Sequence, residues 1–227
     1  MLNKTRILLI HGFGGNTDEV KPFKDYLEAR GYLVSSPELK GHTGIKDDLG
    51  QSSYTDWLWS AESALIALKE DCTEIVVIGF SMGGLIGLNL SIKHHLAALI
   101  TLNSPIYYWD IPRIFSNILK DIRQNRMDYM KSYIKSSFKY PLSSMISFRL
   151  LLSQTKAMLN RVDCPLFVAQ GLLDDTVQKR SADYIYNAVS SKNRQLKFYG
   201  NANHLICFSQ DRDILFGDVL VFIEHVI

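Results

Sequence analysis

Residues 74–84 read Glu74-Ile75-Val76-Val77-Ile78-Gly79-Phe80-Ser81-Met82-Gly83-Gly84, a buried-strand pattern that runs into Gly-x-Ser-x-Gly and then into an apolar helical pattern. A serine on so tight a strand-to-helix turn is lifted clear of its own backbone, near a helix N-terminus that favours developing negative charge. Side chains flanking the turn would collide, and glycine at positions 79 and 83 avoids the collision. The stretch therefore predicts that Ser81 is a nucleophile.

Five further apolar runs with strand character are spread along the chain, and helical patterns lie between them. Most of the runs are continuous rather than alternating, which is typical of parallel strands covered on both faces. The alternation predicts an α/β fold: an open, mostly parallel sheet of about six strands with helices on both faces, and ligands beyond the carboxyl ends of the strands. The expected strands are 6–10, 32–35, 74–78, 96–102, 165–169 and 195–199, and the expected helices are 19–30, 54–70, 82–95, 178–189 and 209–226.

The alternation is interrupted between residues 105 and 161, where helical spacing follows Pro112 and no strand pattern occurs. We interpret residues 1–227 as a single domain with a helical lid inserted at about 106–160. Aromatic and Met side chains of this segment are candidates for an apolar substrate pocket, or they pack the lid onto the core. The candidate pocket residues are Tyr107, Trp109, Phe115, Tyr129 and Met130.

The same segment is basic, with eight Lys or Arg against two Asp over residues 111–149. A solvated outer face of the lid explains this charge more simply than contact with anionic lipid or nucleic acid. We therefore expect neither a nucleic-acid partner nor stable membrane insertion.

A serine needs a base to become a nucleophile, and the chain holds six histidines. Three of them end predicted helices, where the helix dipole favours a cationic side chain: His94, His95 and His225. His204 differs, because it lies in a polar loop between the last strand and the last helix, at the edge of the sheet where Ser81 emerges. We predict that His204 is the general base.

Two adjacent carboxylates, Asp174 and Asp175, follow the strand at 165–169. One of them can accept a hydrogen bond from the imidazole and hold its tautomer, while the other is expected to cap the next helix. The chain order of Ser81, this acid and His204 matches one of the known orders of a serine triad.

The tetrahedral intermediate of such a reaction needs hydrogen-bond donors for its oxyanion. The amide of Met82, directly after the nucleophile, is one candidate. The loop His11-Gly12-Phe13-Gly14-Gly15 can turn a second amide toward the site, and we predict that of Phe13. This loop lacks the Gly-Lys-Ser/Thr ending of a nucleotide-binding loop, so phosphate binding is disfavoured.

From about Lys4 to its C-terminus the chain resembles the α/β-hydrolases of the bacterial carboxylesterase and monoacylglycerol lipase-like group. The resemblance rests on segments 11–15, 40–42, 55–57, 79–84, 170–174 and 203–204. It implies the α/β-hydrolase fold, the acid on Asp174, and oxyanion donors at Phe13 and Met82. Because the sequence begins almost at the strand before the oxyanion loop, we expect the extra N-terminal antiparallel strands of the family to be missing.

Composition limits the other possibilities. Three cysteines are too few for a disulfide framework or a metal-binding knuckle, and the only apolar N-terminal run, 7–10, is far shorter than a signal peptide. We expect a cytoplasmic protein without metal or cofactor, and nothing in the sequence specifies an oligomeric state.

The expected function is hydrolysis of carboxylic esters with short to medium acyl chains, monoacylglycerols included, through an acyl-enzyme intermediate. The same triad can serve a thioesterase, an amidase or a carbon-carbon bond hydrolase, and a non-catalytic ligand-binding protein can keep the fold.

Overall fold

Six parallel strands form the centre of the protein, in the order β2-β1-β3-β4-β5-β6. The structure is a computed structural model that describes residues 5–70, 72–107 and 140–227. Its strands are β1 (Thr5–Ile10), β2 (Leu33–Ser35), β3 (Glu74–Phe80), β4 (Ala98–Leu102), β5 (Leu166–Gly171) and β6 (Arg194–Tyr199). The predicted sheet is confirmed, with every described strand pair parallel.

Burial follows the position of each strand in the sheet. All residues of β4 and β5 are buried, whereas β6, at the edge, alternates between partly buried and exposed residues until Tyr199. Apolar residues on both sides of a strand are needed only where helices cover both faces of the sheet. The continuous apolar runs in the sequence therefore come from the central strands.

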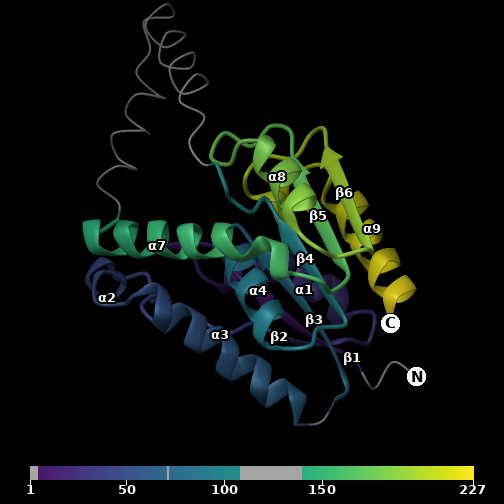
Figure 1. Ribbon diagram of the computed structural model, residues 1–227, viewed down its shortest axis with the longest axis horizontal. Helices are drawn as coiled ribbons and strands as arrows, with labels where there is room; N and C mark the ends of the chain where they lie inside the picture. The colour runs from purple at the N-terminus through teal and green to yellow at the C-terminus, as the bar shows by residue number, and fades with distance from the viewer. Residues whose placement is uncertain (1–4, 71, 108–139) are drawn as a thin grey trace, which may run out of the picture.

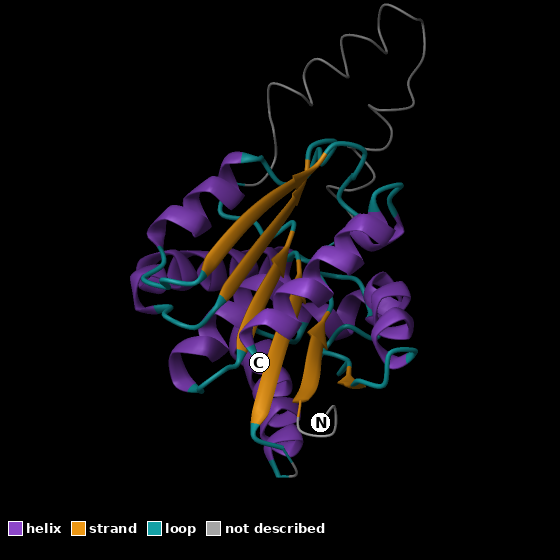
Figure 2. Ribbon diagram, turned by 90° about the vertical axis from the view of Figure 1, so that its right-hand side faces the viewer, coloured by secondary structure: helices purple, strands orange, loops and turns teal. Residues whose placement is uncertain are grey.

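Two layers of helices cover the sheet (Figures 1 and 2). One layer contains α1 (Lys21–Glu28) and α9 (Arg212–Val226), which pack against the same face of the strands through side chains such as Phe23 and Phe216, stacked at 4.2 Å between ring centroids. The other layer contains α3 (Tyr54–Lys69), α4 (Met82–Lys93), α7 (Leu142–Met158) and α8 (Arg180–Ala188). Each large apolar side chain buried in these layers contributes about 1.5–3 kcal/mol to folding.

Several short elements were not expected from the sequence. They are the helix α2 (Lys46–Gly50) and the 3-10 turns η2 (Thr17–Val20), η3 (Leu159–Arg161) and η4 (Ile206–Phe208). The predicted helix 19–30 is divided into η2 and α1 because Pro22, which lacks an N–H, is suited to the first turn of a new helix. Gly31 has φ 85° and ends this segment as predicted.

The predicted lid lies largely outside the described residues, which resume at Tyr140. Its described part is helix α7, which packs on α3 and α4. Asn89 of α4 donates from Nδ2 to Oγ1 of Thr155 at 2.7 Å, and both side chains are buried. The C-terminal half of α7 is therefore joined to the core, and the single-domain assignment with its cap stays a prediction.

The order of the strands determines where a ligand can bind. The chain moves from β1 outward to β2 and then returns to β3 on the other side of β1. The connections after β1 and β3 therefore run in opposite directions, and in open parallel sheets such a switch point, at the carboxyl edge, is where ligands bind. Phe13 follows β1 and Ser81 follows β3, so two of the predicted site residues flank this switch point.

Candidate active site

Ser81 joins β3 to α4 in a conformation that few residues adopt. Its φ is 51° and its ψ is −117°, and it is 8% exposed. A Cβ atom on Gly79 would lie 2.2 Å from the carbonyl oxygen of Gly83, and one on Gly83 would lie 2.3 Å from that of Ile10. Both glycines are thus required for the close packing of this turn. A positive φ at a non-glycine residue costs about 1–3 kcal/mol and persists only where the surrounding structure enforces it.

The elbow is attached to the neighbouring strand. The amide of Ser81 donates to the carbonyl of Leu102, at the end of β4, with a distance of 2.8 Å. The amide of Gly84 donates to the carbonyl of Ser81 at 3.0 Å. These bonds hold the serine between two strand ends, with helix α4 starting directly behind it.

His204 and Asp174 are hydrogen bonded, with 2.9 Å between Nδ1 and Oδ2. A carboxylate only accepts hydrogen bonds, so Nδ1 is the donor in this contact, and in the neutral form of the imidazole Nε2 is the acceptor. The ring of His204 lies 5.2 Å, between centroids, from that of Phe80, the residue before Ser81. The structure therefore brings the predicted base beside the elbow with its tautomer determined by the acid.

The carboxylate of Asp174 is held on both oxygens. Oδ1 accepts from the amides of Thr176 and Val177, each at 2.8 Å, and Oδ2 also accepts from Nε2 of Gln170 at 3.3 Å. The side chain of Asp174 is fully buried. These donors orient it toward the imidazole before any substrate arrives.

Asp175 occupies a different environment, because it is exposed and its Oδ1 accepts from the hydroxyl of Thr176. The expectation that the second aspartate caps the next helix is wrong. Helix α8 begins only at Arg180, its N-cap is Lys179, and no side chain caps it. Four residues separate Asp175 from Arg180, the first residue of α8, which is too far for an N-cap contact.

The two predicted oxyanion donors lie on either side of the switch point between β1 and β3. Met82 is the first residue of α4, where helix amides have no intrahelical acceptor. In the loop after β1, the amide of Gly12 is bound to Oε2 of Glu19 at 3.0 Å, whereas that of Phe13 makes no hydrogen bond within the described part of the chain. Gly14 has φ 65°, and a Cβ there would lie 2.1 Å from the ring of Tyr140.

The side chain of Phe13 belongs to an aromatic cluster beside this loop. Its ring centroid lies 4.9 Å from that of Tyr140, 5.2 Å from that of Phe148 and 5.6 Å from that of Trp57. The cluster connects the loop after β1 with α3 and with the beginning of α7. It therefore holds the backbone of Phe13 in place next to the elbow.

Of the predicted pocket residues, the structure describes Tyr107. Its ring contacts that of Tyr184 at 5.7 Å between centroids, and the guanidinium carbon of Arg180 lies 4.2 Å from its centre. These contacts hold Tyr107 against α8. The other four, Trp109, Phe115, Tyr129 and Met130, lie outside the described residues.

The loop after β1 also contains a buried histidine with a structural role. His11 donates from Nδ1 to the carbonyl of Gly12 at 2.9 Å, and its Nε2 accepts from the amide of Leu39 at 3.2 Å. Burial, with a smaller contribution from the neighbouring His42, lowers the pKa of His11 to about 4 although the hydrogen bond to Gly12 opposes the change. The imidazole is neutral in the folded protein at neutral pH.

We expect the stability conferred by neutral His11 to be complete above its unfolded pKa of 6.5 and to be lost as the pH falls from about 6.5 to about 4. The difference corresponds to roughly 3 kcal/mol of unfolding free energy. Urea unfolding of the wild type and of His11→Gln at pH 7.5, 5.5 and 4.5 measures it. The variant should be less stable at pH 7.5 but should lose less stability on acidification; parallel pH curves would contradict the assignment.

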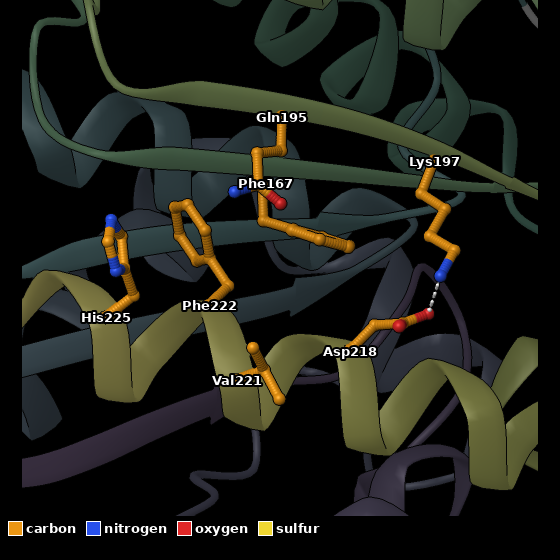
Figure 3. A pocket seen from close by; sticks show the side chains of 7 residues that line it. All are labelled: Phe167, Gln195, Lys197, Asp218, Val221, Phe222 and His225. Carbon is orange, nitrogen blue, oxygen red and sulfur yellow. Dashed lines mark ion pairs between the residues drawn. The ribbon is translucent and has the colours of Figure 1, made fainter.

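A separate pocket lies between strands β5 and β6 and helix α9 (Figure 3). Lys197 and Asp218 point toward each other across one end of it and form an ion pair at 2.6 Å. It is lined by Phe167, Gln195, Lys197, Asp218, Val221, Phe222 and His225. None of the predicted site residues lines it, so it is not the candidate active site.

Two residues of the site were not expected from the sequence. Asn103 follows β4 with φ 47° and is fully buried, and Gln170 donates to Asp174 from the end of β5. Asparagine is one of the few non-glycine residues that tolerate a positive φ. In the sequence, an asparagine directly after a buried strand, at its carboxyl end, is the feature that could have identified Asn103 as a residue of the site.

Two further properties concern the described residues only. None of their helices combines the length and apolar character needed to span a bilayer. Within the same ranges, no group of three or more His, Cys, Asp or Glu side chains is arranged to hold a metal ion.

The chain is similar to known bacterial proteins. It is 27% identical over 227 residues to a carboxylesterase of Bacillus subtilis (strain 168), covering 97% of this chain and 92% of that protein. It is 30% identical over 226 residues to a thermostable monoacylglycerol lipase of Bacillus sp. (strain H-257), covering 95% and 89%. A solved structure described with LipS and LipT, two metagenome-derived lipolytic enzymes, has the same fold, with a TM-score of 0.82 at 19% identity over 98% of this chain and 94% of the other.

The family model that matches is described as the alpha/beta hydrolase family, and it spans residues 7–217. That range includes the loop after β1, the elbow, the Asp174 loop and His204. The chain belongs to the alpha/beta hydrolase family.

Proposed function

We propose that this protein is a serine esterase that hydrolyses carboxylic esters with short to medium acyl chains, monoacylglycerols included. The observation that carries the proposal is the 2.9 Å hydrogen bond between His204 and Asp174, beside the strained elbow of Ser81. The names of the two bacterial relatives, a carboxylesterase and a monoacylglycerol lipase, support the choice of esters.

The reaction proceeds in two halves. Oγ of Ser81 attacks the ester carbonyl carbon while Nε2 of His204 takes the hydroxyl proton, and Asp174 stabilises the imidazolium. The oxyanion accepts hydrogen bonds from the amides of Phe13 and Met82. When the tetrahedral intermediate collapses, the carbon–oxygen bond to the alcohol breaks and His204 protonates the leaving alkoxide.

The second half repeats these steps with water. His204 takes a proton from water as the hydroxide adds to the acyl carbon, and the proton then passes to Oγ of Ser81 as the acid leaves. The acyl-enzyme is a covalent ester of Ser81. Each step uses only these side chains, two backbone amides and water.

A substrate panel tests the proposal: p-nitrophenyl acetate, butyrate, octanoate and palmitate, a monoacylglycerol, an acyl thioester and an anilide. We expect kcat/KM to rise by up to about fourfold for each methylene added until the acyl pocket is full, since a buried methylene contributes about 0.8 kcal/mol. It should fall again at palmitate. The thioester and the anilide should be hydrolysed more slowly than the matched ester.

Other outcomes identify the alternatives. Faster cleavage of the thioester would make the protein a thioesterase, and faster cleavage of the anilide would make it an amidase. No turnover of any substrate, together with no covalent labelling of Ser81 by a fluorophosphonate, would indicate a non-catalytic binding protein.

A further inference from the structure

One buried residue and its backbone neighbour connect the three loops that carry the proposed triad. Asn103 is the first residue after β4, the strand that lies between β3 and β5. Those two neighbours lead to Ser81 and to Asp174. Asn103 is fully buried, and its φ of 47° lies in the left-handed region.

The oxygen and the nitrogen of the Asn103 side chain bond two different parts of the site. Oδ1 accepts from the amide of Gly171 at 2.7 Å. Nδ2 donates to the carbonyls of Asn203 and His204, at 2.9 and 2.8 Å. The amide therefore joins the loop that precedes Asp174 to the loop that contains His204.

The partners determine which way the side chain is turned. A backbone amide can only donate, so Gly171 requires the oxygen of Asn103, and two carbonyls can only accept, so they require the nitrogen. A reversed amide would bring like groups together at three contacts. No other residue type offers one acceptor and two donors on so short a side chain.

The third loop is reached through the backbone. Leu102, immediately before Asn103, accepts from the amide of Ser81 at 2.8 Å, and the amide of Asn103 donates to the carbonyl of Ala169 at 2.9 Å. The left-handed turn at Asn103 thus begins where the elbow is attached. It directs the side chain across the end of β5 toward the histidine loop.

The two loops that Asn103 joins are also packed closely against each other. The amide of Leu173 donates to the carbonyl of Ala202 at 2.9 Å, and a Cβ on Gly171 would lie 2.3 Å from the same carbonyl. A small movement of either loop would change the distance between His204 and Asp174. A side chain that bonds the carbonyl of His204 itself restricts that movement directly.

We infer that Asn103 is a positioning residue: it holds the backbone of His204 so that the imidazole meets both Asp174 and the serine elbow. The expected effect of Asn103 on catalysis rests on the proposed function. Its structural part, the joining of the two loops, is independent of any activity.

Two variants separate the contacts of Asn103. Asn103→Gly removes all three side-chain hydrogen bonds and, because glycine adopts φ 47° without strain, leaves the turn itself acceptable. Asn103→Asp keeps an acceptor for the amide of Gly171 but places a carboxylate oxygen against the carbonyls of Asn203 and His204. If one variant fails to fold, the other still tests the inference.

The matched control is Asn89→Ala. Asn89 is another buried asparagine with both amide atoms bonded. It bonds Leu85 within α4 and Thr155 and Gln154 of α7, and none of these partners belongs to the triad loops. Thermal unfolding of all variants gives their stability. The kinetics are measured at a temperature well below the lowest Tm among the variants.

The first measurement is p-nitrophenyl butyrate hydrolysis. We expect kcat of Asn103→Gly and of Asn103→Asp to fall by about 100-fold, the scale of a 1 Å misplacement of a catalytic group, with KM changed less than about threefold. The control should keep kcat within about threefold at a comparable loss of stability. Equal losses of kcat in the control and in Asn103→Gly would overturn the inference, since a general loss of packing would then suffice.

The second measurement is amide hydrogen exchange, which needs no activity. Exchange in segment 201–206 should become faster in both Asn103 variants, whereas the amide of Gly171 should lose protection in Asn103→Gly and keep it in Asn103→Asp. Unchanged exchange at both places would overturn the inference. A wild type without esterase activity whose variants still show these changes would reject the proposed function but retain the positioning role of Asn103.

Discussion

Replacing Ser81 with alanine is expected to lower kcat for p-nitrophenyl butyrate by roughly 10⁴- to 10⁶-fold, the range found when the nucleophile of a serine triad is removed. Alanine lacks the oxygen that forms the acyl-enzyme, so only binding and the oxyanion donors are left. The fold should be retained, because Gly79 and Gly83, which make the turn possible, are unchanged. Steady-state kinetics and a thermal melt of the same preparation measure both quantities.

The matched control for this change is Ser91→Ala. Ser91 is also buried, lies on α4, and donates to the carbonyl of Leu88 in its own helix, at 2.8 Å. The kcat of Ser91→Ala should stay within about twofold of the wild-type value, as is usual for a substitution away from the reacting groups. A fluorophosphonate should label the wild type once per chain and should not label Ser81→Ala or His204→Ala. Ser81→Ala with a tenth or more of the wild-type activity would refute the nucleophile.

The second large effect is expected at the acid. Asp174→Asn should lower kcat by about 10⁴-fold with little change in KM, because an amide nitrogen in place of Oδ2 favours the wrong tautomer of His204. The contacts from Thr176 and Val177 to the other oxygen can persist, so the loop should keep its shape. Kinetics at pH 7.5 and 8.5 measure the loss.

Asp175→Asn is the internal control, since it makes the same chemical change one residue away. Asp175 is exposed and bonded to Thr176, so the kcat of Asp175→Asn should stay within about threefold of the wild-type value. Comparable losses in the two variants would show that the charge of the loop matters rather than the hydrogen bond to His204. A larger loss in Asp175→Asn would reverse the assignment of the acid.

Much of the fold could be predicted from local patterns. Continuous apolar runs identified the buried strands β1, β3, β4 and β5, because a strand covered on both faces needs apolar side chains at consecutive positions. The helix boundaries were less accurate. Pro22 divides the first predicted helix, and α8 begins two residues later than expected, because capping and turn contacts determine where a helix starts.

Some residues of the candidate site could likewise be predicted from local sequence, and others could not. Ser81 could be recognised because its turn is local: the glycines that permit it lie within two residues of the serine. The choice between Asp174 and Asp175 could not be made from the residues alone, since adjacent side chains have the same chemistry and differ only in the direction in which they point. Resemblance to a family implied Asp174, and the hydrogen bond to His204 shows which of the two is buried against the imidazole.

By itself, the amino-acid sequence determined the α/β architecture, the elbow and the chemical types available to the site, because short-range sterics and the burial pattern of each segment are local properties. Only the tertiary structure decided which acid meets His204 and which backbone groups the side chain of Asn103 bonds. The bonds of Asn103 join residues 68 and 101 positions apart, and no local pattern specifies a contact whose partners become neighbours only when the sheet is complete.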